Sequence, residues 1–124
     1  MSPVNVRSHH DLRVWQLGME LAEDVYRRTM TMPVEERYGL IAQLRRAAAS
    51  VPANIAEGAG RQTAPDFARF LSVARGSLAE LETHLLLCER LGLLEKHADM
   101  HRKIRGARMM LSRLRASLGR RGAK

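Results

Sequence analysis

The sequence holds few of the residues that make disulfides, β-sheets or membrane spans. Of its 124 residues only 4% are aromatic, and there is one cysteine. That residue, Cys88, excludes an intrachain disulfide and a zinc site made from several cysteines. No apolar run approaches the roughly 18–20 residues of a membrane helix, and the first ten residues contain no apolar signal-peptide core. We therefore expect a cytoplasmic protein with no membrane contact.

Turn-forming residues are also scarce. Four prolines and nine glycines are too few to separate the many short strands of an all-β protein. The apolar fraction of 45% and the charged fraction of 27% are typical of an ordered globular chain. Alanine, leucine, arginine, methionine and glutamate dominate, and these residue types favour helices. The length allows one domain and excludes a two-domain enzyme, so the expected class is all-α.

Positive charge is concentrated at one end of the sequence. The chain has 21 basic and 13 acidic residues, and its formal net charge is +8. All 13 acidic residues precede residue 100, whereas the segment 100–124 contains basic residues only. Such a block is typical of proteins that bind phosphate groups, above all those of nucleic acids. A basic helix end that complements the helix dipole is the alternative interpretation.

Hydrophobic periodicity and turn residues predict four helices. The expected ranges are 11–30 with Asp11 as N-cap, 33–60 with Pro33 in its first turn, 63–92 with Thr63 as N-cap, and 96–118. Long helices with short connections pack as an antiparallel up-down-up-down four-helix bundle. We expect this bundle to occupy residues 11–119, between an N-terminal extension (1–10) and a basic tail (120–124).

The first expected helix carries more apolar surface than a monomeric bundle needs. Its two apolar stripes are Leu12, Trp15, Met19, Ala22 and Tyr26 on one side and Val14, Leu17, Leu21 and Val25 on the other. The second expected helix has a similar excess, a row of alanines opposite its core stripe. We expect a homo-oligomer that buries these second faces. An interface on the second stripe would leave Trp15 in the core and place Leu17 and Leu21 against another copy.

A proline inside the second helix predicts a local irregularity. Pro52 removes one backbone hydrogen bond, so we predict a kink near 48–52. Asn54 is expected to bond a carbonyl that the missing N–H leaves free. Glu57 is expected to bond Arg61, or free backbone amides, at a turn that begins with Gly58. We interpret these residues as structural, because no general acid or base partner lies nearby in the sequence.

No catalytic or metal-binding pattern is present. A di-iron bundle needs Glu-x-x-His on two helices, and no histidine here follows a glutamate at that spacing. His97 and His101 are four residues apart, but no third ligand stands out. Cys88 lies on the apolar stripe of its helix, where a small buried side chain is the ordinary role. We expect no enzyme activity, no metal and no cofactor.

Several motifs together resemble a known family. They are DLRVWQ at 11–16, ERYGL at 36–40, QLRRA at 43–47, SVPANIAEGAGR at 50–61 and ARGSLAELE at 74–82. This combination, which covers about residues 11–94, resembles the 23S rRNA intervening-sequence protein family, also called the four-helix-bundle protein family. The basic block after residue 100 matches none of the family's motifs.

The resemblance implies an antiparallel four-helix bundle in the bacterial cytosol, with relatives that assemble as homopentamers. Members are encoded within intervening sequences of 23S rRNA genes or elsewhere, and they mostly lack an assigned activity. Related accessory proteins of diversity-generating retroelements bind nucleic acid and a reverse transcriptase. No catalytic residue carries over from the family.

The expected function is therefore RNA or other nucleic-acid binding by a non-enzymatic, oligomeric bundle, with a homopentamer as the specific expectation. The candidate phosphate contacts are Arg102, Lys103, Arg105, Arg108, Arg113, Arg115, Arg120 and Arg121. No aromatic residue lies among them, so they would attract phosphates without reading bases. The alternative is a scaffold that recruits a protein partner and has no nucleic-acid role.

Overall fold

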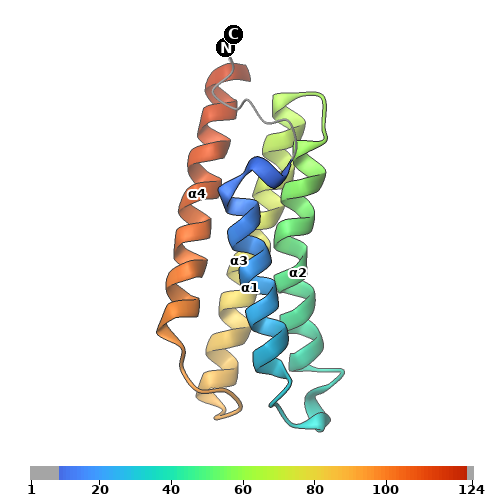
Figure 1. Ribbon diagram of the computed structural model, residues 1–124, viewed down its shortest axis with the longest axis vertical. Helices are drawn as coiled ribbons and strands as arrows, with labels where there is room; N and C mark the ends of the chain where they lie inside the picture. The colour runs from blue at the N-terminus through green and yellow to red at the C-terminus, as the bar shows by residue number, and fades with distance from the viewer. Residues whose placement is uncertain (1–8, 123–124) are drawn as a thin grey trace.

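The computed structural model describes residues 9–122, which form helices and no strand. Its elements are η1 (His9–Asp11), α1 (Arg13–Thr29), η2 (Val34–Glu36), α2 (Leu40–Ala59), α3 (Ala64–Arg90) and α4 (Ala98–Gly122). The four long helices lie side by side (Figure 1). The α1–α2 and α3–α4 connections lie at one end of the molecule, and the α2–α3 connection lies at the other. The expected all-α class is confirmed.

Each long helix contacts the next along the chain, and α1 also contacts α4, so the four enclose one core. The core is aliphatic and draws on all four helices, with Leu21, Leu44, Leu78 and Ile104 fully buried. Burying one such side chain contributes roughly 1.5–3 kcal/mol. Cys88 is fully buried too, as its place on the apolar stripe predicted. In the part of the chain that the structure describes, no helix has the length and apolarity to cross a membrane.

Two of the predicted helix starts are wrong. Asp11 is not an N-cap, because a short 3-10 turn occupies 9–11 and α1 begins only at Arg13. Pro33 does not open α2, because residues 34–36 form a separate 3-10 turn and α2 begins at Leu40. The N-cap position is Gly39, and the Glu36 carboxylate accepts a hydrogen bond of 3.3 Å from the backbone N–H of Leu40, one of the N–H groups without a partner inside the helix.

The start of α3 is confirmed. The hydroxyl of Thr63 accepts a hydrogen bond of 3.3 Å from the backbone N–H of Asp66, and Pro65 lies in the first turn. At the other end, Gly92 has a φ of 73°, a conformation that glycine adopts without strain. The fourth helix continues to Gly122, beyond the predicted end at 118.

The structure contradicts an interface on the second α1 stripe. Leu21 is fully buried and Val14 and Val25 are buried with it, so this stripe faces the core. In the first stripe, Met19 is 38% exposed and Tyr26 is 46% exposed, whereas Leu12, Trp15 and Ala22 are partly buried and pack against the core. The reason is Gly18, which lies among the residues of the second stripe and lets α1 approach α2. A Cβ atom there would lie 3.3 Å from Cγ1 of Val51.

Pro52 lies within α2, which continues through it to Ala59 without a break. Its ring is buried against Gly18, because a Cβ on that glycine would lie 3.5 Å from both Cβ and Cδ of the proline. Asn54 does not bond the carbonyl that Pro52 leaves free, which belongs to Ala48. Its amide instead donates to the carbonyl oxygen of Ser50 at 2.8 Å and to the hydroxyl of that serine at 2.9 Å.

The Ser50 hydroxyl also reaches across to α3. It shares a hydrogen bond of 2.8 Å with the hydroxyl of Ser77, which donates in turn to the carbonyl of Val73. These three polar residues, Ser50, Asn54 and Ser77, therefore form a connected cluster between α2 and α3 in an otherwise apolar contact.

Gly58 lies inside α2 and does not begin the turn, because the helix ends only at Ala59. This position requires glycine because α3 lies very close to α2 here. A Cβ atom on Gly58 would lie 2.9 Å from Cδ1 of Phe67, closer than real Cβ contacts. Next to Gly58 in the sequence, Glu57 accepts a hydrogen bond of 2.7 Å from Arg61, as predicted. The Arg61 guanidinium also lies over the ring of Phe70. This segment joins α2 to α3.

Candidate nucleic-acid interface

The basic residues of α4 are arranged around a buried stripe. Ile104, Ala107 and Leu111 face the core and are fully buried. At 100° per residue, Lys103 lies on the flank toward α1, whereas Arg108 and Arg115 lie on the flank toward α3. Arg102, Arg113 and Arg120 follow the outer face, which is the side farthest from the core.

Lys103 is engaged inside the protein. Its ammonium lies 3.3 Å from Asp24 and 3.6 Å from Glu20, both on α1, and 3.6 Å from Asp99. Partial burial acts to lower the pKa of Lys103, but the hydrogen bond to Asp24 and the three carboxylates outweigh it, and the pKa is raised. This side chain ties α4 to α1 and is already neutralised, so it is a weak candidate for a phosphate contact.

Two further members of the predicted set have carboxylate partners. Arg102 bonds Asp99 one turn before it. The hydrogen bond from Arg102 is the main cause that lowers the pKa of Asp99; desolvation opposes it, and Lys103 acts in the same direction as Arg102. Arg108 lies 3.4 Å from Glu82 of α3. Both arginines are partly exposed, so they can still reach a ligand, but each would have to share its charge.

The contact between α3 and α4 follows a seven-residue spacing. Near the α3–α4 loop, Nε2 of His101 lies 2.7 Å from Glu89, and both side chains are mostly buried. Seven residues back along α3 and seven forward along α4, Glu82 meets Arg108. The same step again gives Arg75 and Arg115. Here a basic residue stands on α3 in the position where the two earlier pairs have an acid.

Two hollows open at this third position. One, of about 330 Å³, is lined by Ala68, Arg75, Ser112, Arg115, Ala116 and Gly119. The other, of about 300 Å³, is lined by Arg75, Arg108, Met109, Ser112 and Arg113. They share Arg75 and Ser112, and we call them together the arginine groove. No carboxylate lines either hollow.

The remaining arginines of the predicted set are free of acidic partners. Arg105, Arg113, Arg115 and Arg120 are exposed, and none makes an ion pair with another residue in 9–122. The side chain of Arg121 lies outside the described residues. The structure thus divides the predicted contacts into paired residues, all in the loop half of α4, and unpaired ones, of which Arg105 lies in the loop half and the others in the C-terminal half.

Sequence reasoning missed Arg75. In the sequence Arg75 is only one member of the ARGSLAELE motif, because its relevance depends on which residue of α4 it faces. A signal was present, however: residues 89, 82 and 75 of α3 are spaced by seven and read acid, acid, base. That change of sign marks the groove.

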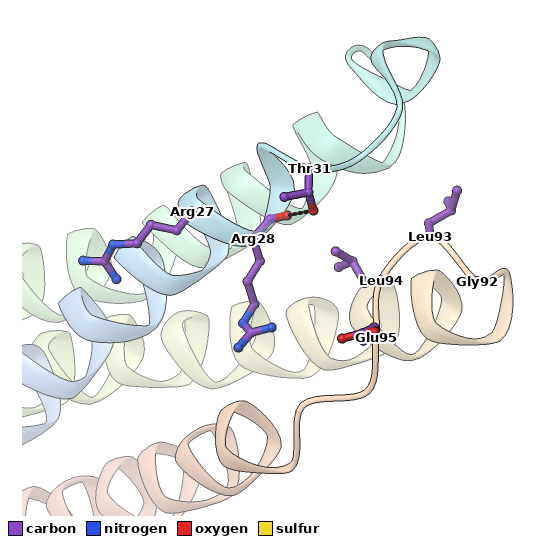
Figure 2. Close-up of a pocket in the computed structure, with 7 residues that line it drawn as sticks. All are labelled: Arg27, Arg28, Thr31, Gly92, Leu93, Leu94 and Glu95. Carbon is purple, nitrogen blue, oxygen red and sulfur yellow. Dashed lines mark hydrogen bonds between the residues drawn. The ribbon is translucent and has the colours of Figure 1, made fainter.

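A larger hollow lies elsewhere and is less suited to an anion. It measures about 600 Å³ and is formed by Arg27, Arg28 and Thr31 near the end of α1 together with residues 92–95 (Figure 2). The carboxyl ends of α1 and α3 bring partial negative charge to this end of the molecule. Arg27 is already paired with Glu23 and Asp24.

The histidines considered as metal ligands have other partners. His101 bonds Glu89, and Nδ1 of His97 accepts a hydrogen bond of 3.2 Å from the backbone N–H of Met100, so it caps α4. Among the residues with described positions, no three acidic, histidine or cysteine side chains gather as a metal site would require.

The family model described as 23S rRNA-intervening sequence protein matches residues 10–113, which is most of the chain. The match extends beyond residue 94, where the family's motifs ended, and includes α4 as far as Arg113. A search of the curated proteins finds no match.

Proposed function

This chain belongs to the 23S rRNA-intervening sequence protein family, and we propose that it is a non-enzymatic protein that binds RNA through the unpaired arginines of α4. The observation that carries the proposal is a set of exposed arginines that make no ion pair within residues 9–122, namely Arg105, Arg113, Arg115 and Arg120. Unpaired guanidinium groups attract phosphates, and a protein that neutralises several of them gains affinity by releasing counterions.

The binding would be governed by the phosphate backbone and not by base sequence. No aromatic side chain lies on α4, so bases have no platform for stacking there. Arg108, Arg113 and Arg115 line the two hollows of the arginine groove together with Arg75. The family description points to an RNA context, and we extend it to this chain as part of the proposal.

We further propose an up-down-up-down bundle that assembles as a cytoplasmic homo-oligomer, with a pentamer as the specific model. The alternation of the connections between the two ends supports this topology (Figure 1). Assembly is supported by an exposed face on α1 and α2, which we call the outer α1–α2 face, made of Met19, Tyr26, Ala42, Ala49 and Ala53. A ring would repeat the α4 arginines around one axis, so that weak phosphate contacts act together.

Charge reversal tests the RNA-binding proposal. We expect the triple change Arg105→Glu, Arg113→Glu and Arg115→Glu to lower the affinity for a single-stranded RNA by about tenfold or more. The slope of log K against log salt should fall by about 2, because three phosphate contacts are lost. The control reverses Arg37, Arg46 and Arg90, exposed arginines that make no ion pair within 9–122. Equal losses in both variants would show that only net charge matters.

A protein-binding scaffold is the second candidate. The observation that favours it is a cluster of exposed leucines near the end of α3, Leu86, Leu87 and Leu91. Purification without nuclease separates the two: co-purifying RNA supports the first function. RNA-free protein that captures a partner only while these leucines are intact supports the second.

A further inference from the structure

The geometry points to a binding site for one phosphate group in the arginine groove, held by Arg75, Arg115 and Ser112. This inference rests on the proposed function in one respect only, that the phosphate can belong to an RNA backbone. The site itself is argued from the contact between α3 and α4.

The first argument is the order of charges along that contact. Glu89 pairs with His101 and Glu82 pairs with Arg108, each across the same two helices. At the next position of the series, Arg75 and Arg115 line one hollow together. Two guanidinium groups that share a hollow repel each other, whereas an acid at residue 75 would have continued the series. An anion between them removes the repulsion.

The second argument is the set of donors. A guanidinium group offers a rigid fork of N–H donors that matches two oxygens of a phosphate, and two such groups can bind one phosphate from different sides. Ser112 lines both hollows and adds a hydroxyl donor. No carboxylate lines the groove, so nothing in it competes with the ligand for these donors.

The third argument is space. Toward the C-terminal end of α4 and the N-terminal end of α3, the hollow is lined by Ala68, Ala116 and Gly119, which are among the smallest residues. They leave the hollow of about 330 Å³ open between the two arginines. Glu82, the nearest acid in the series, is held by Arg108, so its charge is partly neutralised.

The phosphate group bound in the groove can come from either of two ligands, a phosphodiester of RNA or a free phosphate compound. Both present a tetrahedral group with oxygens that accept from guanidinium. An RNA would in addition follow α4 toward Arg105 and Arg113, whereas a small phosphate compound would need the groove alone. The two sources therefore differ in which variants weaken binding.

Thermal unfolding of the full chain tests the site directly. The probe is inorganic phosphate at about 10 mM against chloride of equal ionic strength, and the key variant is Arg75→Glu. We expect phosphate to raise the melting temperature of the wild type by about 3 °C or more and to leave the variant unchanged. In chloride, the variant should melt at or above the wild-type temperature, because the introduced carboxylate can pair with Arg115.

Binding of a 20-nucleotide oligouridylate is the second measurement. Its control is Arg90→Glu, which changes the same charge on the same helix at an exposed position without an ion pair in the described chain. Circular dichroism checks that both variants keep their helices. We expect Arg75→Glu to weaken RNA binding at least about fivefold more than the control if the phosphate belongs to RNA.

The outcomes separate the two claims. Phosphate stabilisation lost in Arg75→Glu supports the site. An extra loss of RNA binding then assigns it to the RNA backbone, and an unchanged RNA affinity assigns it to a free phosphate compound. If the wild type binds no RNA but retains the phosphate effect, the proposed function fails and the site stands. If phosphate stabilises wild type and variant equally, the site is refuted, even where α4 binds RNA.

Discussion

At Gly58 and Phe70, α2 and α3 lie too close together for a side chain on Gly58: a Cβ atom there would lie 2.8 Å from Cβ of Phe70. The contact explains why this position takes glycine inside a helix, where glycine otherwise costs about 1 kcal/mol relative to alanine. It also makes the SVPANIAEGAGR segment a packing motif in this structure, since its members contact the neighbouring helices.

Replacing this glycine should destabilise the fold. Gly58→Ala pushes against Cβ of Phe70 and the backbone oxygen of Phe67, which cannot move without shifting α3. We expect the free energy of unfolding in urea to fall by about 1–3 kcal/mol. The control is Gly76→Ala, at an exposed position of α3 with no atom within 4 Å of the new Cβ. That change should instead stabilise by about 0.5–1 kcal/mol, and a loss of equal size in both would contradict the packing explanation.

Lys103 should matter for stability and little for RNA. Lys103→Met removes the cation that lies between Asp24 of α1 and Asp99 of α4. Since the side chain is 27% exposed, solvent screens the pair and the expected loss is about 0.5–1 kcal/mol. Lys96→Met, at an exposed position without an ion pair in the described chain, is the control. An RNA affinity that falls as far as in the α4 arginine variants would make Lys103 a phosphate contact after all.

Protonation of Asp99 should account for part of the stability that the fold loses in acid. The folded-state pKa of Asp99 is lowered from 3.8, first by the hydrogen bond from Arg102 and then by Lys103. The stability that it contributes is therefore complete above pH 3.8 and is lost as the pH falls through the lower folded-state pKa. Unfolding measured between neutral pH and pH 2 should show a shallower acid loss for Asp99→Asn. The control is Glu80→Gln, at an exposed carboxylate with no ion pair within 9–122. It should alter the pH dependence of stability less than Asp99→Asn does.

If the outer α1–α2 face is the interface between copies of the chain, charge placed on it should prevent assembly. Met19→Glu combined with Ala49→Glu places charge on this face, and we expect a folded monomer in sedimentation at micromolar concentration. Leu87→Glu, which adds charge at an exposed apolar residue of α3, should preserve the oligomer. Leu21→Glu should unfold the chain, because that side chain is fully buried. A wild type that sediments as a 14.0 kDa monomer contradicts the proposal of assembly.

How far the sequence could predict these features depends on the range of the interaction. The start of α3 follows from Thr63, Pro65 and Asp66, which act within one turn, so it was predictable. The buried side of α1 was not, because its two stripes are similarly apolar and only the approach of Gly18 to α2 decides between them. Arg75 lay beyond reach for the same reason, since its importance depends on the alignment of α3 with α4.

The hydroxyl pair of Ser50 and Ser77 has a consequence for how the chain selects one packing among many. Aliphatic side chains discriminate weakly between alignments of two helices, because after a shift of one helix along the other a leucine can pack where another leucine packed before. A slip of α2 along α3 by seven residues would instead set Ser50 against Phe70 or His84. The hydrogen bond between Ser50 and Ser77 would then be lost, at a cost of about 0.5–1.5 kcal/mol, while Ser77 keeps its bond to the carbonyl of Val73 within α3. This single polar contact thereby widens the energy gap between the native alignment and its shifted competitors.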